Sequence, residues 1–303
     1  MSFQRVAIIG LGLIGGSIGL AVREHLPEVT TRGYDSDPWV RTRGRERQLA
    51  DEICDDPADA VAGADLVILC VPVGAMGEAA RAIAAALPAG AVVSDVGSSK
   101  QAITRELAEA LPANAIIPAH PVAGTEHSGP DAGFATLFHQ RWCIVTPPAG
   151  ADAEQVAALV AFWEALGAMV ETMDAEHHDR VLAVTSHIPH LIAYTIVGTA
   201  SDLEEVTRSE VIKYSAGGFR DFTRIAASDP TMWRDVFLNN REAVLDMLDR
   251  FLTDLALMRE AIRAGDGETM FDLFARTRAV RRSIVALGQD DPRPDFGRKD
   301  HQG

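Results

Sequence analysis

The chain has 303 residues, of which 47% are hydrophobic, and its formal net charge is −15 at pH 7. A chain of this length and composition can bury a sizeable core and form one or two domains. The negative charge would repel a phosphate backbone and an anionic membrane surface, so we expect no nucleic-acid or membrane partner. An anionic small-molecule substrate stays compatible with it, because a local arginine can bind a carboxylate inside an acidic protein.

Short β-branched runs alternate with helical stretches in the first half of the chain, as a doubly wound parallel sheet requires. The glycines and prolines that separate these runs favour strands over pieces of buried helix. The expected strands cover residues 6–9, 31–34, 66–71, 91–95, 115–118 and 142–146. The pattern predicts an α/β domain over residues 1–150.

Beyond a loop-like stretch at 147–150, the apolar residues mostly repeat at helical spacing. The expected helices cover residues 153–166, 175–201, 203–213, 220–225, 230–264 and 267–287, with one more strand at 169–173. We therefore predict an all-helical domain over residues 151–288 and a disordered polar tail over 289–303.

One apolar stripe follows a spacing of three and four residues within the predicted 230–264 helix. It consists of Val244, Leu248, Phe251, Leu255, Met258 and Ile262. Such a stripe usually packs in a core.

A glycine-rich turn follows the first expected strand and opens a helix. Gly10, Gly12 and Gly15 form the pattern G-x-G-x-x-G, with Leu13 and Ile14 between the last two glycines. Glycines at these positions allow a pyrophosphate to approach backbone N–H groups at the helix N-terminus. The alternatives are a turn that is glycine-rich for packing alone, or a flavin site.

Asp35 ends the next expected strand, about 20 residues further along, where an acidic side chain accepts hydrogen bonds from the adenine ribose. A carboxylate there repels a 2′-phosphate, and neither Arg32 nor Ser36 forms a convincing phosphate pocket. The combination predicts a Rossmann domain that binds NAD in preference to NADP.

The cysteines and the first residues bear on the compartment. Cys54, Cys70 and Cys143 are an odd number without paired spacing, which favours free thiols in a reducing cytoplasm. No signal peptide or membrane-spanning segment is evident. We expect a cytoplasmic protein.

Three further segments follow the glycine-rich turn in order. They are AHPVAGTEHSG at 119–129, SHIPH at 186–190 and GGFRDFTRIAASDPTMWRD at 217–235. With these motifs the chain resembles the prephenate/arogenate (cyclohexadienyl) dehydrogenase family, from about Val6 to about Leu287. The resemblance implies an NAD-dependent oxidative decarboxylation on the route to tyrosine, performed by a homodimer whose helical half could use the apolar stripe.

By this resemblance His120 accepts the proton of the substrate's 4-hydroxyl group, and Ser98 holds the hydroxyl, the imidazole or the nicotinamide. Taken alone, a histidine after a strand is often structural, and Ser98 or its neighbour Ser99 could instead cap the following helix. Because the imidazole must be neutral to accept a proton, an ordinary pKa of about 6.5 predicts that activity falls as the pH drops through that value.

The resemblance also assigns residues to substrate binding. Arg224 binds the ring carboxylate, for which its planar guanidinium is suited, although an interdomain salt bridge is the alternative. Arg220 stands where the family often has lysine and either contacts the side-chain carboxylate or lines the mouth. His190 meets the side-chain end of the substrate, and His187 has a packing or orienting role.

Other residues match positions that line or gate the pocket: Thr125, Glu126, Gly217 and Trp233. Asp179 matches an acidic residue that pairs with the substrate-binding arginine across the dimer. Val71 and Pro72 resemble the loop that borders the nicotinamide ribose. His177 and His178 are adjacent on a helix and so point apart, and we predict no metal site.

Two other functions stay open at this point. A 3-hydroxyacid-type NAD(P) dehydrogenase would need a catalytic lysine on the long helix, and residues 175–201 contain none. A non-catalytic NAD-responsive regulator would not need His120, Ser98 and Arg224 together. Prephenate and arogenate differ only in a keto or amino acid side chain, and the sequence does not choose between them.

Overall fold

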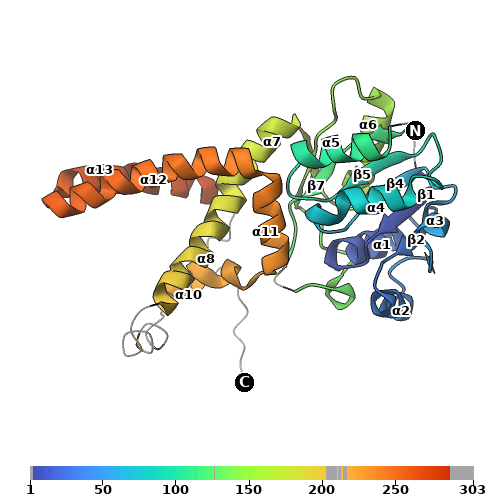
Figure 1. Cartoon of the computed structure of the whole chain (residues 1–303), viewed down its shortest axis with the longest axis horizontal. Helices are drawn as coiled ribbons and strands as arrows, with labels where there is room; N and C mark the ends of the chain where they lie inside the picture. The colour runs from blue at the N-terminus through green and yellow to red at the C-terminus, as the bar shows by residue number, and fades with distance from the viewer. Residues whose placement is uncertain are drawn as a thin grey trace. The chain divides into compact units, whose positions relative to one another are not determined.

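A computed structural model describes residues 3–112, 114–125, 127–202, 210, 213 and 217–286 (Figure 1). The chain divides into two compact units, Met1–Met247 and Leu248–Gly303. All of the candidate site residues lie in the first unit. The second contains most of one long helix and all of the next.

A six-stranded sheet forms the centre of the first unit. Its strands are β1 (Arg5–Ile9), β2 (Thr30–Tyr34), β3 (Glu52–Ile53), β4 (Leu66–Leu69), β5 (Val92–Asp95) and β6 (Ala115–Ile116). All neighbours are parallel, in the order β3-β2-β1-β4-β5-β6. This is the strand order of dinucleotide-binding domains, in which ligands bind at the carboxyl ends of the strands where the order reverses. The predicted Rossmann fold is confirmed.

The strand expected at 142–146 does not join this sheet. A separate sheet contains β7 (Ala119–Pro121), β8 (Trp142–Val145) and β9 (Met169–Thr172), with β7 antiparallel and β9 parallel to β8. The expected strand at 115–118 ends early, because Pro118 has no N–H to continue the ladder and the chain turns there into β7. The spacing found the strand segments but assigned 142–146 to the wrong sheet.

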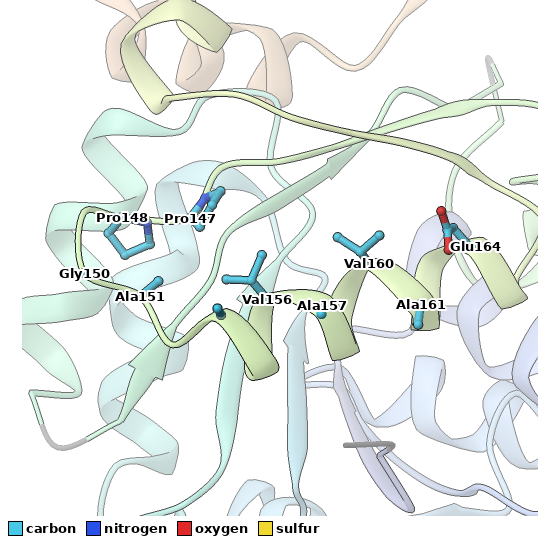
Figure 2. A pocket seen from close by; sticks show the side chains of 10 residues that line it. Pro147, Pro148, Gly150, Ala151, Val156, Ala157, Val160, Ala161 and Glu164 are labelled. Carbon is cyan, nitrogen blue, oxygen red and sulfur yellow. The ribbon is translucent and has the colours of Figure 1, made fainter.

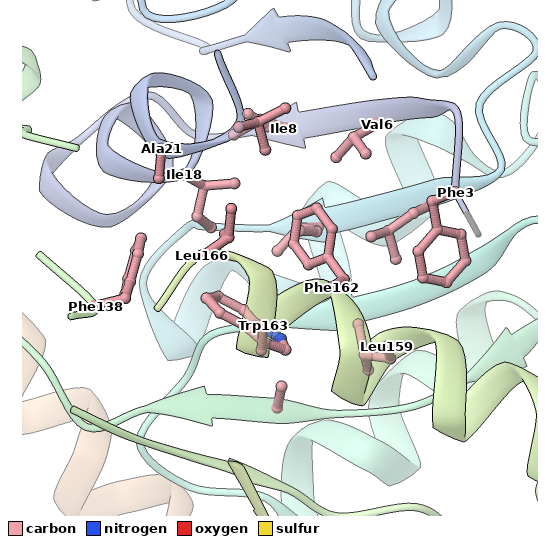
Figure 3. Packing of buried hydrophobic residues seen from close by; sticks show 14 of the residues in the cluster. Phe3, Val6, Ile8, Ile18, Ala21, Phe138, Leu159, Phe162, Trp163 and Leu166 are labelled. Atoms are coloured by element: carbon pink, nitrogen blue, oxygen red, sulfur yellow. The ribbon is translucent and has the colours of Figure 1, made fainter. Parts of the chain in front are cut away.

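Alternate residues of the central strands face two different cores. Val6 and Ile8 of β1 pack in one core with α1 (Leu13–His25) and α6 (Ala153–Ala165), as Figure 3 shows. Ala7 and Ile9 pack in the other with α3 (Pro57–Val61), α4 (Met76–Ile83) and α5 (Gln101–Ala110). Burial on both faces explains why the strands are continuous apolar runs in the sequence.

Among the described residues, five helices begin at an aspartate whose carboxylate accepts a hydrogen bond from a backbone N–H in the first turn. These are Asp37 before α2 (Pro38–Arg47), Asp56 before α3, Asp152 before α6, Asp174 before α7 (Ala175–Leu182) and Asp229 before α11 (Pro230–Asn239). Helix α5 differs, because its N-cap residue is Lys100, which makes no side-chain cap. Its first N–H groups need acceptors from elsewhere.

The predominantly helical part continues from α7 through the π-helical turn η3 (Ala183–His187) into α8 (Ile188–Ser201). The remaining helices are α10 (Gly217–Thr223), the 3-10 turn η4 (Arg224–Ala227), α11, α12 (Arg241–Ala264) and α13 (Gly267–Ala286). Most of the helix expected at 203–213, and the whole tail predicted at 289–303, lie outside the described residues.

The single helix expected at 230–264 is broken at Asn240, so that prediction was wrong. Asn240 leaves the helical conformation with φ −110° and ψ 32°. Its buried side chain donates to the backbone oxygen of Asp179 at 2.8 Å and lies 3.1 Å from Nδ1 of His187. Helical periodicity could not reveal a break whose cause is a contact with another segment.

The segment Ala175–Ser201 is long and apolar enough to cross a membrane, judged by length and composition alone. Core helices of globular proteins meet the same criterion. Here the segment carries three buried polar residues, His178, Asp179 and His187, and each has a hydrogen-bonding partner elsewhere in the first unit. Buried polar residues of this kind are costly in a membrane-spanning helix.

A hollow of about 550 Å³ lies between the loop at 147–151 and α6 (Figure 2). Its lining is prolines, small residues and valines, with Glu164 as the one charged side chain. None of the predicted site residues borders it. The chemistry must therefore be sought at the carboxyl edge of the central sheet.

Candidate active site

The glycines of the first turn have two different roles. Gly10 has a φ of +100°, and a Cβ there would lie 2.5 Å from the backbone oxygen of Cys70. A Cβ on Gly15 would lie 1.9 Å from the backbone oxygen of Gly10. These two glycines are required by packing, whereas a Cβ on Gly12 would meet nothing within 4 Å. The open backbone at Gly12, at the start of α1 beside Leu13 and Ile14, suits the approach of a phosphate.

Asp35 follows β2 with its carboxylate fixed against this turn. One oxygen accepts from the N–H of Leu11 at 2.8 Å and the other from the N–H of Asp37 at 3.0 Å. The nearby Arg41 donates to the backbone oxygens of Asp35 and Ser36 at 2.8 and 3.1 Å and pairs with Asp55. The carboxylate is therefore held next to the glycine turn, as a ribose-binding residue must be.

Val71 and Pro72 lie between β4 and the 3-10 turn η1 (Val73–Ala75), with Val71 half-buried and Pro72 exposed. Helix α11 packs on this turn, because a Cβ on Gly74 would lie 2.7 Å from a carboxylate oxygen of Asp235. The loop expected to border the nicotinamide is thus in contact with the helical part of the first unit.

His120 lies in β7 and is 8% exposed. Its Nδ1 is 2.9 Å from Nε2 of His178, and Nδ1 of His178 is 2.9 Å from Oδ1 of Asp179. His178 and Asp179 are buried on the inward side of α7. The three side chains form a continuous hydrogen-bonded series.

Asp179 also supplies the missing cap of α5. Its Oδ1 accepts from the N–H of Lys100 at 2.7 Å and its Oδ2 from the N–H of Gln101 at 3.0 Å. A carboxylate is stabilised at a helix N-terminus by these N–H groups and by the helix dipole. This position differs from the expected pairing with an arginine across the dimer, since both oxygens are engaged within the chain.

A fully buried ion pair connects β5 to β7 beside His120. Nζ of Lys100 lies 2.5 Å from Oδ2 of Asp95 and donates to the backbone oxygen of Ala119 at 2.7 Å. Burial raises the pKa of Asp95 and lowers the pKa of Lys100, and the pairing opposes both shifts. The hydrogen bond from the ammonium group thus fixes the backbone of Ala119, the residue before His120.

The histidines of the site are kept neutral by their surroundings. Burial, followed by the neighbouring His178, Lys100 and His187, holds the pKa of His120 well below its usual value. Burial also lowers the pKa of His178, although the hydrogen bond to Asp179 opposes this, and brings the pKa of His187 to about 4. His120 is therefore unprotonated at neutral pH and can accept a proton.

A second group of predicted residues comes from α8, η4 and α11. The ring of His190 stacks on the buried Trp233, with ring centroids 3.6 Å apart, and its Nδ1 lies 2.8 Å from the backbone oxygen of Ser186. Burial, aided by the charge of Arg224, lowers the pKa of His190. The guanidinium of Arg224 is exposed and makes no ion pair within the described ranges, so the salt-bridge alternative finds no support there.

The other predicted residues are placed as follows. Gly217 begins α10, and Arg220 is exposed with its Nε 3.5 Å from Asp221. Thr125 is exposed in the loop after β7, and Glu126 lies outside the described residues.

Ser98 is half-buried between β5 and α5. Neither Ser98 nor Ser99 caps α5, because Asp179 does so. The hydroxyl of Ser98 is therefore available for the role that the resemblance gave it.

Sequence reasoning missed four residues of this arrangement, namely Lys100, Asp95, His178 and Asn240. One signal was available for His178, because it shares the inward face of α7 with Leu182, four residues later. The contacts of Lys100 with Ala119, of His178 with His120 and of Asn240 with Asp179 join segments distant in sequence, and no local pattern shows them.

Comparison with known proteins agrees with this architecture. Residues 18–172 match the prephenate dehydrogenase nucleotide-binding domain, and residues 174–276 match the prephenate dehydrogenase dimerization domain. A cyclohexadienyl dehydrogenase of Zymomonas mobilis is 46% identical over 93% of this chain and 96% of its own length.

Two solved structures share the fold over nearly the whole chain. Prephenate dehydrogenase from A. aeolicus, in complex with hydroxyphenyl propionate and NAD+, is 33% identical with a TM-score of 0.87, covering 94% of this chain and 99% of its own. An arogenate dehydrogenase from Synechocystis is 25% identical with a TM-score of 0.80, covering 93% of this chain and 100% of its own. The chain therefore belongs to the prephenate dehydrogenase family.

Proposed function

We propose that this protein oxidises and decarboxylates prephenate, arogenate or both, with NAD as the hydride acceptor, in tyrosine biosynthesis. The observation that carries this proposal is the burial of His120, which lowers its pKa, at the carboxyl edge of a dinucleotide-binding sheet in a chain that belongs to this family. The relative of highest identity above is named a cyclohexadienyl dehydrogenase, which supports a substrate of this class.

The reaction sets three requirements for the protein. Hydride leaves C4 of the ring and carbon dioxide leaves C1, so the 4-hydroxyl proton must be accepted as C4 gains carbonyl character. Nδ1 of His120 is occupied by His178, which leaves Nε2 to accept that proton. We assign Ser98 to positioning the hydroxyl. Bound NAD supplies the hydride acceptor.

The ring carboxylate needs a cation that is free to bind it. Arg224 is exposed, and its charge lowers the pKa of His190. Its planar guanidinium can bind a carboxylate by two hydrogen bonds. His190 is held by Trp233 and Ser186 and would meet the side-chain end of the substrate. We propose that Thr125, Gly217 and Arg220 line or gate the pocket, and the same role for Glu126 stays a prediction. We reassign Asp179 to orienting His178.

The form of the cofactor follows from Asp35. Its carboxylate faces the glycine turn, where a 2′-phosphate would be repelled, and the cation next to it, Arg41, is engaged by backbone oxygens and Asp55. These contacts support NAD over NADP.

Exposed apolar side chains on the two long helices support a homodimer. On α12 they include Leu252, Leu255, Leu257 and Ile262, and on α13 Phe271, Phe274 and Val280. Isolated exposed leucines are ordinary, but several large exposed apolar side chains on two successive helices favour an interface. Leu255 and Ile262 among them belong to the predicted stripe. We therefore propose that the predicted stripe packs against a second copy. The free cysteines are in keeping with a cytoplasmic location.

The direct test is NADH formation at about 340 nm with prephenate and with arogenate, each with NAD and with NADP. We expect turnover with at least one substrate and a higher kcat/KM with NAD, because of Asp35. No turnover with any of the four pairs would contradict the proposal and favour a non-catalytic NAD-responsive regulator.

Replacing the proton acceptor should slow the chemical step. We expect His120→Asn to lower kcat by about a hundredfold or more, the usual scale for a positioned acid-base group, with little change in KM. The matched control is His25→Asn at the exposed end of α1. A kcat for His120→Asn within a few-fold of the parent value would remove His120 from this role.

The burial of His120 changes the expected pH dependence. An ordinary histidine pKa of about 6.5 predicted that activity is lost as the pH falls through that value. Because burial holds the pKa of His120 well below it, the neutral base persists at lower pH, and activity should be lost only as the pH falls through the depressed pKa. The measurement is log(kcat/KM) against pH. An acid limb centred at 6.5 or above would contradict the assignment.

Removing the carboxylate-binding cation should act mainly on binding. We expect Arg224→Ala to raise KM by about tenfold to a hundredfold, the range for a lost charge-assisted hydrogen bond, with a smaller effect on kcat. The KM of Arg224→Lys should lie between those of the parent and of Arg224→Ala, because lysine keeps the charge but lacks the planar guanidinium. Arg105→Ala, on an exposed part of α5, is the control. An unchanged KM in Arg224→Ala would show that another group binds the carboxylate.

A further inference from the structure

We propose that His120, His178 and Asp179 form a proton relay, in which His178 takes the Nδ1 proton of His120 as Nε2 of His120 takes the proton of the substrate hydroxyl. The inference rests on the proposed function and deepens it. His178 is a positioning residue here, since it acts on the substrate only through His120.

The direction of each hydrogen bond follows from the end of the series. A carboxylate only accepts, so Nδ1 of His178 must carry the proton that it shares with Asp179 over 2.9 Å. Neutral His178 therefore has a bare Nε2, which accepts the Nδ1 proton of His120 over 2.9 Å. His120 is then left with a bare Nε2. The series selects the one neutral tautomer of His120 that can accept a substrate proton.

The carboxylate of Asp179, at the end of the series, is held rigidly. Asp179 accepts from the N–H groups of Lys100 and Gln101 as well as from His178, and its backbone oxygen accepts from Asn240. Rotation of the carboxylate would leave two N–H groups at the N-terminus of α5 without their acceptor, which is costly in a buried place. The orientation of Asp179 is therefore set by the fold, and the tautomers follow from it.

The relay also determines where the positive charge resides. A cation on His120 would lie close to the ammonium group of Lys100, with neutral His187 adding no compensating charge. A cation on His178 would lie against the carboxylate of Asp179, the interaction that opposes the effect of burial there. Lys100 disfavours a proton on His178 as well, but the nearby Asp95, which pairs with Lys100, favours it together with Asp179. Moving the proton one ring further places the charge beside its counter-ion.

The step balances as a double proton transfer coupled to hydride loss. The substrate O–H bond breaks as the Nε2–H bond of His120 forms, and the Nδ1–H bond of His120 breaks as the Nε2–H bond of His178 forms. Bound NAD would accept the hydride lost from C4, and the electrons of the C1–carboxylate bond enter the ring as carbon dioxide leaves. His178 returns its proton along the same route, and His120 gives its Nε2 proton back to the phenolate oxygen of the product, so that no net proton is released.

The first test needs no turnover. In protein labelled with ¹⁵N at histidine, we expect His120 as the Nδ1–H tautomer in the parent and loss of that state in His178→Phe. His177→Gln is the matched control, because His177 is the exposed neighbour on the same helix. Finding His120 as the Nε2–H tautomer in the parent would overturn the relay, whatever the variants do.

The second test is kinetic. We expect His178→Gln to lower kcat by at least about tenfold and His178→Phe by about a hundredfold, with KM for both substrates nearly unchanged. In mixtures of H2O and D2O, a plot of the parent kcat against the deuterium fraction should be curved, because two protons move. The same plot for His178→Gln should be linear, because only one proton moves. Thermal unfolding and NAD titration check that each variant is folded.

The outcomes separate the two proposals. A parent that turns over substrate while His178→Phe keeps the parent kcat overturns the relay alone. A parent that turns over none of the cyclohexadienyl substrates overturns the proposed function, and the tautomer of His120 still decides the relay geometry. If His178→Phe fails to fold, the parent spectrum and His178→Gln decide.

Discussion

The carboxylate of Asp179 is the contact on which the arrangement of this site depends. Helix α5 has no side-chain cap of its own, and Asp179 from α7 supplies the acceptors for its first two N–H groups. The same carboxylate orients His178, and through it His120 on β7. One buried charge thus joins the helical part of the chain to the carboxyl edge of the dinucleotide-binding sheet, where the reaction is expected.

At His120, burial and charge both lower the pKa of the imidazole. The pair of Lys100 and Asp95 is fully buried, and removing one partner would leave an uncompensated charge, which is strongly destabilising. The ammonium group also disfavours a proton on His120. A structural ion pair therefore contributes to the chemistry by keeping the acceptor neutral. Asn240, at the break between α11 and α12, holds Asp179 and His187 together.

Much of the fold could be predicted from local patterns. Gly10 and Gly15 are needed for backbone packing and Asp35 for the ribose, and each signal lies within one strand-turn-helix unit. The placement of β8 and the break at Asn240 could not be predicted in this way, because both depend on partners distant in sequence. His178 was missed because, beside His177, it was considered only as part of a metal pair, whereas its contact with His120 joins α7 to β7.

The most direct test of this account is a crystal structure with NAD and a 4-hydroxyphenyl product analogue bound. We predict that the phenolic oxygen lies within hydrogen-bonding distance, about 3 Å, of Nε2 of His120, while Nδ1 still contacts His178. The side-chain end of the analogue should lie near His190, because the ring carboxylate that Arg224 is proposed to bind is absent from a product. A phenolic oxygen bound by other groups, with His120 turned away from it, would contradict the account.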